Sequence, residues 1–248
     1  MASIRQIIVL RDAAELAAAA AKMIMQAATE AITQWGRFVI ALSGGSTPAA
    51  AYQIIHDHYY NQTDWAKWYI FLGDERAVPM TDPQSNMGMA KRTLLHGLPI
   101  PEAQIFAVQT QLSVVAAAAA YDQQIRKLFG TAEPRMDLIL LGLGDDGHTA
   151  SLFPGLPARH EKIKLVTFSP PGTLPPPLDR ITFTFPLINL ARQVIFLMAG
   201  EKKKNVVARL LAADVDPDVI PAANVRPMDG KLIYMMDQAS AGNINSIL

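Results

Sequence analysis

The segment FVIALSGGSTPAAAYQIIHDHYY, which runs from Phe38 to Tyr60, is the most informative about the fold class. It begins with a continuous apolar run, Phe38 to Leu42, which is typical of a strand buried on both faces. A turn with two adjacent glycines follows, and Pro48 stands where the first turn of a helix is expected. The remaining residues have the composition of a helix. Strand, glycine turn and helix in this order form the unit from which parallel α/β sheets are built.

Apolar strands and helices continue to alternate on both sides of this segment. Asp12, with Glu15 three residues later, resembles a capping box and predicts a long helix that ends at Gly36. Further strands are expected at 68–72, 104–108, 136–141, 181–185, 194–198 and 231–236, and further helices at 86–95, 113–129 and 201–213. The sequence therefore predicts the α/β class, with a mainly parallel sheet covered by helices on both faces. Sheets of this kind bind ligands at the carboxyl ends of their strands.

The proline-rich segment SPPGTLPPPLDR, Ser169 to Arg180, is the most conspicuous loop. It could link two domains, but a connection between two strands is the simpler interpretation. A chain of 248 residues, half of them apolar, can bury a substantial core within one large α/β domain. We therefore expect residues 1–248 to form a single domain.

The composition argues against several classes of function. Lys plus Arg and Asp plus Glu are equal at 22 each, so no net charge attracts nucleic acid or anionic lipid. There is no cysteine, which removes disulfides, thiolate metal ligands and thiol nucleophiles. The first apolar run is short and is followed by charged residues, unlike a signal peptide, and the alanine-rich stretch after it lacks the roughly 18 uninterrupted apolar residues of a membrane span. We expect a cytoplasmic protein with neither nucleic-acid nor membrane partners.

The glycine turn, Ser43 to Pro48, is the first candidate site. A strand precedes it and a helix follows, so its backbone N–H groups and the positive end of the helix suit a phosphate. The alternative is a turn that needs glycine only for tight packing. It is not a P-loop, because no lysine follows the glycines. The candidate phosphate-binding residues are Ser43, Gly44, Gly45, Ser46 and Thr47.

The segment LGLGDDGHTASLFPG, Leu141 to Gly155, is the second candidate. Its glycines have the spacing G-x-G-x-x-G of dinucleotide-binding loops, but two aspartates stand where a pyrophosphate needs neutral N–H donors. In addition, the stretch about 20 residues further on has no acidic residue to bind a ribose. Asp146 and His148 lie two residues apart beyond a strand end, where a carboxylate can orient an imidazole for general-base chemistry. The alternative is a polar turn with a surface histidine.

A third loop, GDERAVP from Gly73 to Pro79, follows another apolar strand. Its consecutive charges would ordinarily form a solvated turn, but its position predicts that Asp74 and Arg76 meet the other two loops at one sheet edge. His56 and His58 point in different directions on a helix, so they make a poor metal pair, and we expect no metal site. No G-x-S-x-G motif is present, which disfavours the serine mechanism of α/β-hydrolases.

Six blocks occur in order between Leu42 and Pro227: LSGGSTP, GDERAVP with Ser85 and Asn86 after it, DLILLGLGDDGHTASLFPG, RITFTFPLIN, GEKK and PAANVRP. Together they resemble the 6-phosphogluconolactonase family. The resemblance implies a Rossmann-like fold shared with glucosamine-6-phosphate deaminase and ribose-5-phosphate isomerase. It also implies hydrolysis of 6-phosphogluconolactone in the oxidative pentose phosphate pathway, without a cofactor.

The resemblance also assigns roles by position. His148 matches the family's general base, with Asp146 beside it, and Asp74 and Arg76 match polar groups of the same cleft. The residues that would hold the substrate phosphate are Ser43 to Thr47, Arg180 and Lys203. The sequence leaves open whether Asp74 or Asp146 contacts the imidazole. Lys204 and Met87 depart from the family pattern, at positions where a small residue and an aromatic residue are common.

Two other functions remain to be weighed. A deaminase or isomerase of an amino-sugar phosphate shares the D-G-H motif but has a glutamate before the following proline, where this chain has Phe153 before Pro154. The acid for ring opening is therefore missing. A non-catalytic sugar-phosphate sensor would keep the glycine turn and could lose Asp146 and His148, yet both are present, and no helix-turn-helix or basic extension is apparent.

Overall fold

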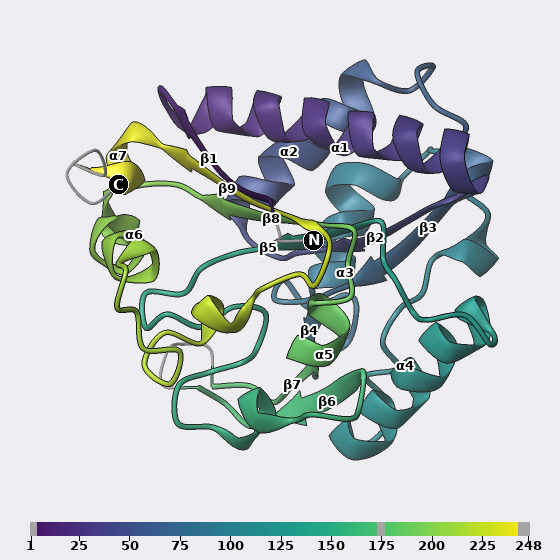
Figure 1. Ribbon diagram of the computed structural model, residues 1–248. Coiled ribbons are helices and arrows are strands. Elements are labelled where there is room, and N and C mark those ends of the chain that lie inside the picture. Colours follow the sequence, from purple (N-terminus) through teal and green to yellow (C-terminus); the bar gives the residue numbers. More distant parts are fainter. Residues whose placement is uncertain (1–3, 173–176, 243–248) are drawn as a thin grey trace.

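Within residues 4–172 and 177–242, which the computed structural model describes, a six-stranded parallel sheet forms the centre of the molecule (Figure 1). Every neighbouring pair of strands in it runs parallel. The strand order is β1 (Ile4–Leu10), β9 (Lys231–Asp237), β8 (Gln193–Met198), β5 (Leu138–Leu141), β2 (Phe38–Leu42) and β3 (Trp68–Leu72). The predicted α/β class is confirmed.

Helices cover both faces of this sheet (Figure 1). One face packs against α1 (Ala13–Trp35), α2 (Ser46–His58), α3 (Asn86–Ala90) and a π-helical turn at Lys91–Leu95. The other packs against α4 (Val114–Phe129), α5 (Phe185–Ile188) and α6 (Lys204–Leu211), while α7 (Gln238–Ala241) follows β9. Single 3-10 turns lie at Trp65–Lys67, Glu102–Gln104, Pro157–His160, Glu201–Lys203 and Pro221–Asn224.

Each strand of the large sheet divides its side chains between two cores. In β2, Phe38, Ile40 and Leu42 face the core shared with α1 and α2, whereas Val39 and Ala41 face the core shared with α4. This alternation follows from the two-residue period of a strand. Both sets must be apolar because both faces are covered, which explains the uninterrupted apolar run seen in the sequence.

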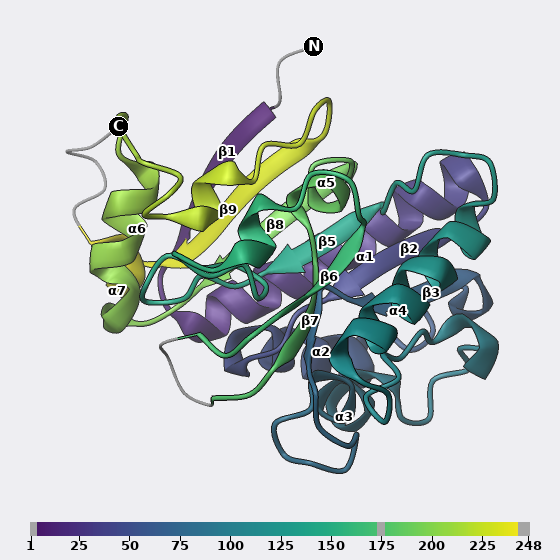
Figure 2. The ribbon, with the colours of Figure 1, turned by 90° about the horizontal axis from the view of Figure 1, so that it is seen from below.

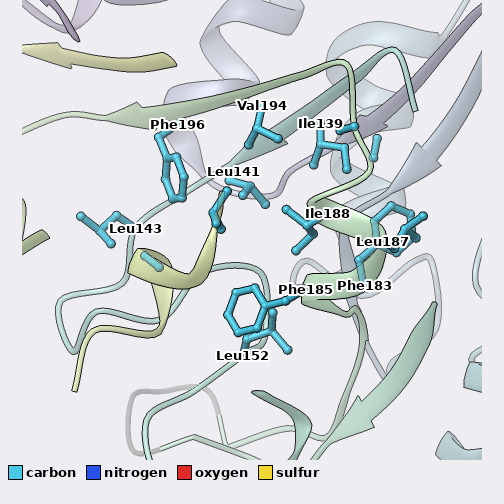
Figure 3. Packing of buried hydrophobic residues seen from close by; sticks show 14 of the residues in the cluster. Ile139, Leu141, Leu143, Leu152, Phe183, Phe185, Leu187, Ile188, Val194 and Phe196 are labelled. Atoms are coloured by element: carbon cyan, nitrogen blue, oxygen red, sulfur yellow. The ribbon is translucent and has the colours of Figure 1, made fainter. Parts of the chain in front are cut away.

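A small antiparallel sheet lies on the α4 side, seen from below in Figure 2. Its strands are β4 (Asp74–Arg76), β7 (Arg180–Phe183) and β6 (Val166–Ser169), with β7 in the middle. Figure 3 shows Phe183, Phe185 and Ile188 facing Ile139 and Leu141 of the large sheet in one apolar cluster. This packing fixes the small sheet against the end of β5.

Several elements differ from the sequence-based expectation. The segment Gly73 to Pro79, expected as a loop, contains β4, because β7 supplies it with hydrogen-bonding partners from a distant part of the chain. Residues 104–108 form no strand: only Ile105 pairs with Ile70, and stacking of Phe106 on Phe71, with ring centroids 4.3 Å apart, holds the segment. The proline-rich loop joins β6 to β7, as expected, although residues 173–176 lie outside the described part.

The connections place a crevice between β2 and β5. The chain leaves β2 through α2 on one face of the large sheet, and leaves β5 toward the small sheet on the other face. Neighbouring strands whose connections run to opposite faces leave room at their carboxyl ends, where α/β proteins bind ligands. None of the helices in the described residues has both the length and the hydrophobicity of a membrane span.

Candidate active site

A cavity of about 370 Å³ opens at the carboxyl ends of β2, β3, β5 and β8. The three loops predicted to meet there do so, and the small sheet adds Arg180 from β7. Of the residues to which the sequence analysis gave a catalytic or substrate-binding role, all but Asp146 line the cavity: Ser43, Gly44, Gly45, Ser46, Thr47, Asp74, Arg76, His148, Arg180 and Lys203. Asp146 lies directly behind His148.

The glycine turn forms one end of the cavity. Gly45 is the N-cap of α2 with φ 106°, a conformation that residues with a side chain rarely adopt, and it offers no side-chain cap. The first N–H groups of a helix have no acceptor within the helix, and the helix dipole adds positive potential there. Beneath the turn, the buried Tyr52 hydroxyl accepts from Ser43 N at 2.9 Å and donates to Ser43 O at 3.0 Å. The turn is thereby held in a shape that suits an anion.

Two cationic side chains approach the same cavity. Lys203 lies in the turn after β8, and its Nζ donates to Asp145 Oδ1 at 2.6 Å. Buried Asp237 fixes that turn by accepting from Gly200 N at 3.0 Å. Arg180 is 5% exposed, and its guanidinium lies over the Phe153 ring, 5.4 Å from the centroid. Burial lowers the pKa of Arg180 and the charge of Asp74 opposes this, so the guanidinium keeps its charge.

His148 and Asp146 form a hydrogen-bonded pair in the loop after β5. The imidazole Nδ1 lies 2.6 Å from Asp146 Oδ1, and His148 N donates to the same oxygen at 3.1 Å. Gly144 makes room for the pair, since a Cβ there would lie 2.0 Å from Nδ1. Burial raises the pKa of Asp146, but its hydrogen bond to His148 and the imidazole charge outweigh burial and lower the pKa overall. An ionised Asp146 accepts a hydrogen bond from Nδ1–H, and in this tautomer of the neutral imidazole Nε2 carries the lone pair.

Asp74 belongs to a separate network. Its Oδ2 accepts from the buried Ser151 hydroxyl at 2.7 Å and lies 4.0 Å from Arg180 Nη1. Asn86 Nδ2 donates to the Asp74 carbonyl at 2.8 Å, while Asn86 Oδ1 accepts from Arg76 Nη1 at 2.9 Å. The carboxylate that contacts the imidazole is therefore Asp146, and Asp74 organises the opposite wall.

Some residues of the site were not predicted as such. Asn86 links Asp74 to Arg76, but only its place in a resembling block pointed to it. Asp145 was treated as an obstacle to a pyrophosphate, and its pairing with Lys203 depends on a contact 58 positions apart. Ala150 lines the cavity with φ 48°, the only positive φ of a non-glycine residue among the described residues, and sequence carries no mark of such strain. Met87 packs into the core instead of the cavity.

The sequence matches the protein family described as glucosamine-6-phosphate isomerases/6-phosphogluconolactonase over residues 11–234. The chain belongs to this family. The resemblance of the ordered blocks is thus confirmed. A family member from a Nostoc species, named 6-phosphogluconolactonase, is 38% identical over 241 residues, which span 96% of this chain and 97% of that protein.

Solved structures agree with this membership. The structure titled 6-phosphogluconolactonase from Trypanosoma cruzi is 34% identical, superposes with a TM-score of 0.88 and covers 98% of each chain. A structure of a monomeric glucosamine-6-phosphate deaminase has a TM-score of 0.80 at 19% identity, over 95% of this chain and 98% of the other. The likeness to the deaminase shows the shared fold alone.

Proposed function

We propose that the protein hydrolyses 6-phosphoglucono-1,5-lactone to 6-phosphogluconate, in the oxidative pentose phosphate pathway. The observation that carries the proposal is the His148–Asp146 pair in a cavity whose other end is a helix N-terminus with two nearby cations. A lactone is an ester that water attacks readily once a base removes its proton. The cavity combines such a base with a place for the substrate phosphate.

The reaction uses Nε2 of His148 as the base. Nε2 takes a proton from a water molecule as the oxygen of that water bonds to C1 of the lactone. The negative charge that develops on the C1 oxygen needs donors, and Arg76 lines the cavity with part of its guanidinium beyond the bonds to Asn86 and Gln84. The bond from C1 to the ring oxygen then breaks, and the imidazolium returns its proton to that oxygen. The product is the open-chain carboxylic acid, which releases its proton to solvent and becomes the carboxylate.

The phosphate end contributes to the rate as well as to affinity. The turn from Ser43 to Thr47, with Arg180 and Lys203, holds the phosphate and so fixes C1 against the water. Binding energy from a group remote from the reacting bond is used for orientation in this way. None of these steps requires a cofactor or a metal ion.

The deaminase alternative is disfavoured by Phe153. Its ring lies 4.4 Å from the His148 ring and lines the cavity, so an apolar group stands where the deaminase pattern has a carboxylate. The sensor alternative does not account for a base hydrogen-bonded to a carboxylate. The single domain over residues 1–248, the cytoplasmic location, the absence of a metal and the absence of nucleic-acid partners stay predictions.

An assay with three substrates tests the proposal. Freshly generated 6-phosphogluconolactone and unphosphorylated gluconolactone are hydrolysed in parallel, with spontaneous opening subtracted, and glucosamine 6-phosphate is assayed for ammonia. We expect saturable hydrolysis of the phosphorylated lactone, a far lower kcat/KM for the other lactone, and no ammonia above background. Saturable ammonia release, or equal rates on both lactones, would overturn the assignment.

A further inference from the structure

Glu75 is a buried carboxylate beside the site that the proposed reaction does not use. It lies in β4 between Asp74 and Arg76, and side chains alternate along a strand. Asp74 and Arg76 line the main cavity, whereas Glu75 lies against a second cavity of about 280 Å³ behind the strand. Its side chain is 2% exposed. A charged group in such a place requires hydrogen-bond partners.

The Glu75 carboxylate collects four donors. Oε1 accepts from Arg76 N and from Asn86 N, each at 2.8 Å. Oε2 accepts from Met87 N at 2.8 Å and from the Ser85 hydroxyl at 3.1 Å. Burial raises the pKa of Glu75, and the three backbone N–H groups oppose this. All four partners donate, as an ionised carboxylate requires.

These bonds tie β4 to the start of α3. Asn86 and Met87 begin that helix, and their N–H groups have no acceptor within it. With its backbone held by Glu75, Asn86 turns its side chain to the cavity wall, where it bonds both Arg76 and the Asp74 carbonyl. The same side-chain oxygen also lies against the glycine turn, since a Cβ on Gly44 would lie 2.0 Å from Asn86 Oδ1.

We propose that Glu75 is a positioning residue, which fixes Arg76 and Asn86 in the wall of the cavity without touching the substrate. The role assigned to Arg76 rests on the proposed lactonase function. The positions of Arg76 and Asn86 do not depend on that function. The effect of Glu75 on kcat and its effect on these positions are therefore measured in separate experiments.

Glu75→Gln tests the proposal. Glutamine has the same size, but its amide nitrogen faces donors, so the bonds to one of the two oxygens are lost. A misplacement of this kind costs about 10- to 100-fold in rate, and we expect that loss in kcat, with affinity for inorganic phosphate within about twofold of the parent. In the Glu75→Gln background, Arg76→Ala should cost far less than it costs alone, because the two residues act as a unit.

Asp137→Asn is the matched control. Asp137 is a buried carboxylate that accepts from Val39 N at 2.8 Å and Arg192 Nε at 3.1 Å, next to the amino end of β5 and away from the cavity. It should lower Tm and leave kcat unchanged. Unchanged kcat in Glu75→Gln, together with a Tm as low as that of the control, would make Glu75 a structural residue only and overturn the proposal.

A crystal structure of Glu75→Gln gives an answer that does not depend on activity. The Arg76 Nη1 to Asn86 Oδ1 distance, 2.9 Å in the parent, should lengthen beyond hydrogen-bonding range. An unchanged distance would overturn the proposal, whereas a lengthened distance in a protein that hydrolyses no lactone would overturn the proposed function instead. If Glu75→Gln fails to fold, Ser85→Ala removes one of the four bonds and should lower kcat in the same direction by a smaller factor, and an unchanged kcat there would count against the proposal.

Discussion

The two ends of the cavity are built largely by different parts of the fold. At the phosphate end, two turns of the large sheet supply most of the ligands, the turn between β2 and α2 and the turn after β8 that carries Lys203, and β7 of the small sheet adds Arg180. At the reacting end, the loop after β5 carries His148, and the small antiparallel sheet carries Asp74 and Arg76. The first end relies on backbone N–H groups and on charge. The second relies on side chains held by hydrogen bonds between distant segments.

This difference predicts a separation of kinetic effects. Changes at the phosphate end should act mainly on KM, because they remove binding that is made before the reaction. Changes at the reacting end should act mainly on kcat, because Nε2 of His148 and the donors around C1 matter most in the transition state. Substitutions at each end therefore test whether phosphate binding and the reaction are carried by separate sets of residues.

The largest effect is expected for His148→Asn. Loss of a general base lowers kcat by about 10²- to 10⁴-fold, while inorganic phosphate should bind as in the parent protein. Steady-state kinetics with 6-phosphogluconolactone and calorimetry with phosphate measure the two quantities. His160→Asn is the control, because His160 lies in an exposed turn outside the cavity. Unchanged kcat in His148→Asn would show that the His148 imidazole is not the base at the reacting end.

A smaller effect, on KM, is expected for Lys203→Ala. A lost charged hydrogen bond costs about 1.5 to 3 kcal/mol, which corresponds to a rise in KM of about 12- to 140-fold. The neighbouring Lys202→Ala is the control, because Lys202 does not line the cavity. If both variants have the KM of the parent protein, Lys203 does not hold the phosphate.

The smallest effect is expected for Asp145→Asn, which removes the ion-pair partner of Lys203. The substrate phosphate must compete with this carboxylate, and an ion pair as exposed as this one contributes at most about 1 kcal/mol. KM should therefore fall by no more than about fivefold. Asp229→Asn is the control, because it breaks a similarly exposed ion pair, with Arg135, that does not line the cavity, and it should leave KM unchanged. A higher KM in Asp145→Asn would mean that Asp145 holds Lys203 in place for the phosphate.

The phosphate end could be predicted from sequence more fully than the reacting end. The turn from Ser43 to Thr47 is local: an apolar strand, two glycines and a proline in the first helical turn specify it. The Asp146–His148 pair is also local, because only two residues separate its members. In these places the sequence carries both the residues and their arrangement.

The rest depends on contacts between distant segments. Asp74 accepts a hydrogen bond from Ser151, 77 positions away, and β4 forms only because β7 pairs with it, so the sequence predicted a loop at this place. The strand β1 was not predicted, because Arg5 and Gln6 interrupt its apolar residues at an edge of the sheet, where one side of the strand meets solvent. Because the pairing of β4 with β7 could not be predicted either, the sequence alone would place Glu75 at the surface.

The pH dependence of kcat in the parent protein and in His148→Asn decides whether His148 is the general base. The pKa of Asp146 lies below its usual value, so its carboxylate stays charged as the pH falls through the range in which an imidazole takes up a proton. Loss of activity toward acid pH therefore reports the imidazole. After subtraction of spontaneous opening at each pH, kcat of the parent should rise with pH through one ionisation, and the residual rate of His148→Asn should lack it. Full activity with the same ionisation in His148→Asn would show that His148 is not the base and that another group activates the water.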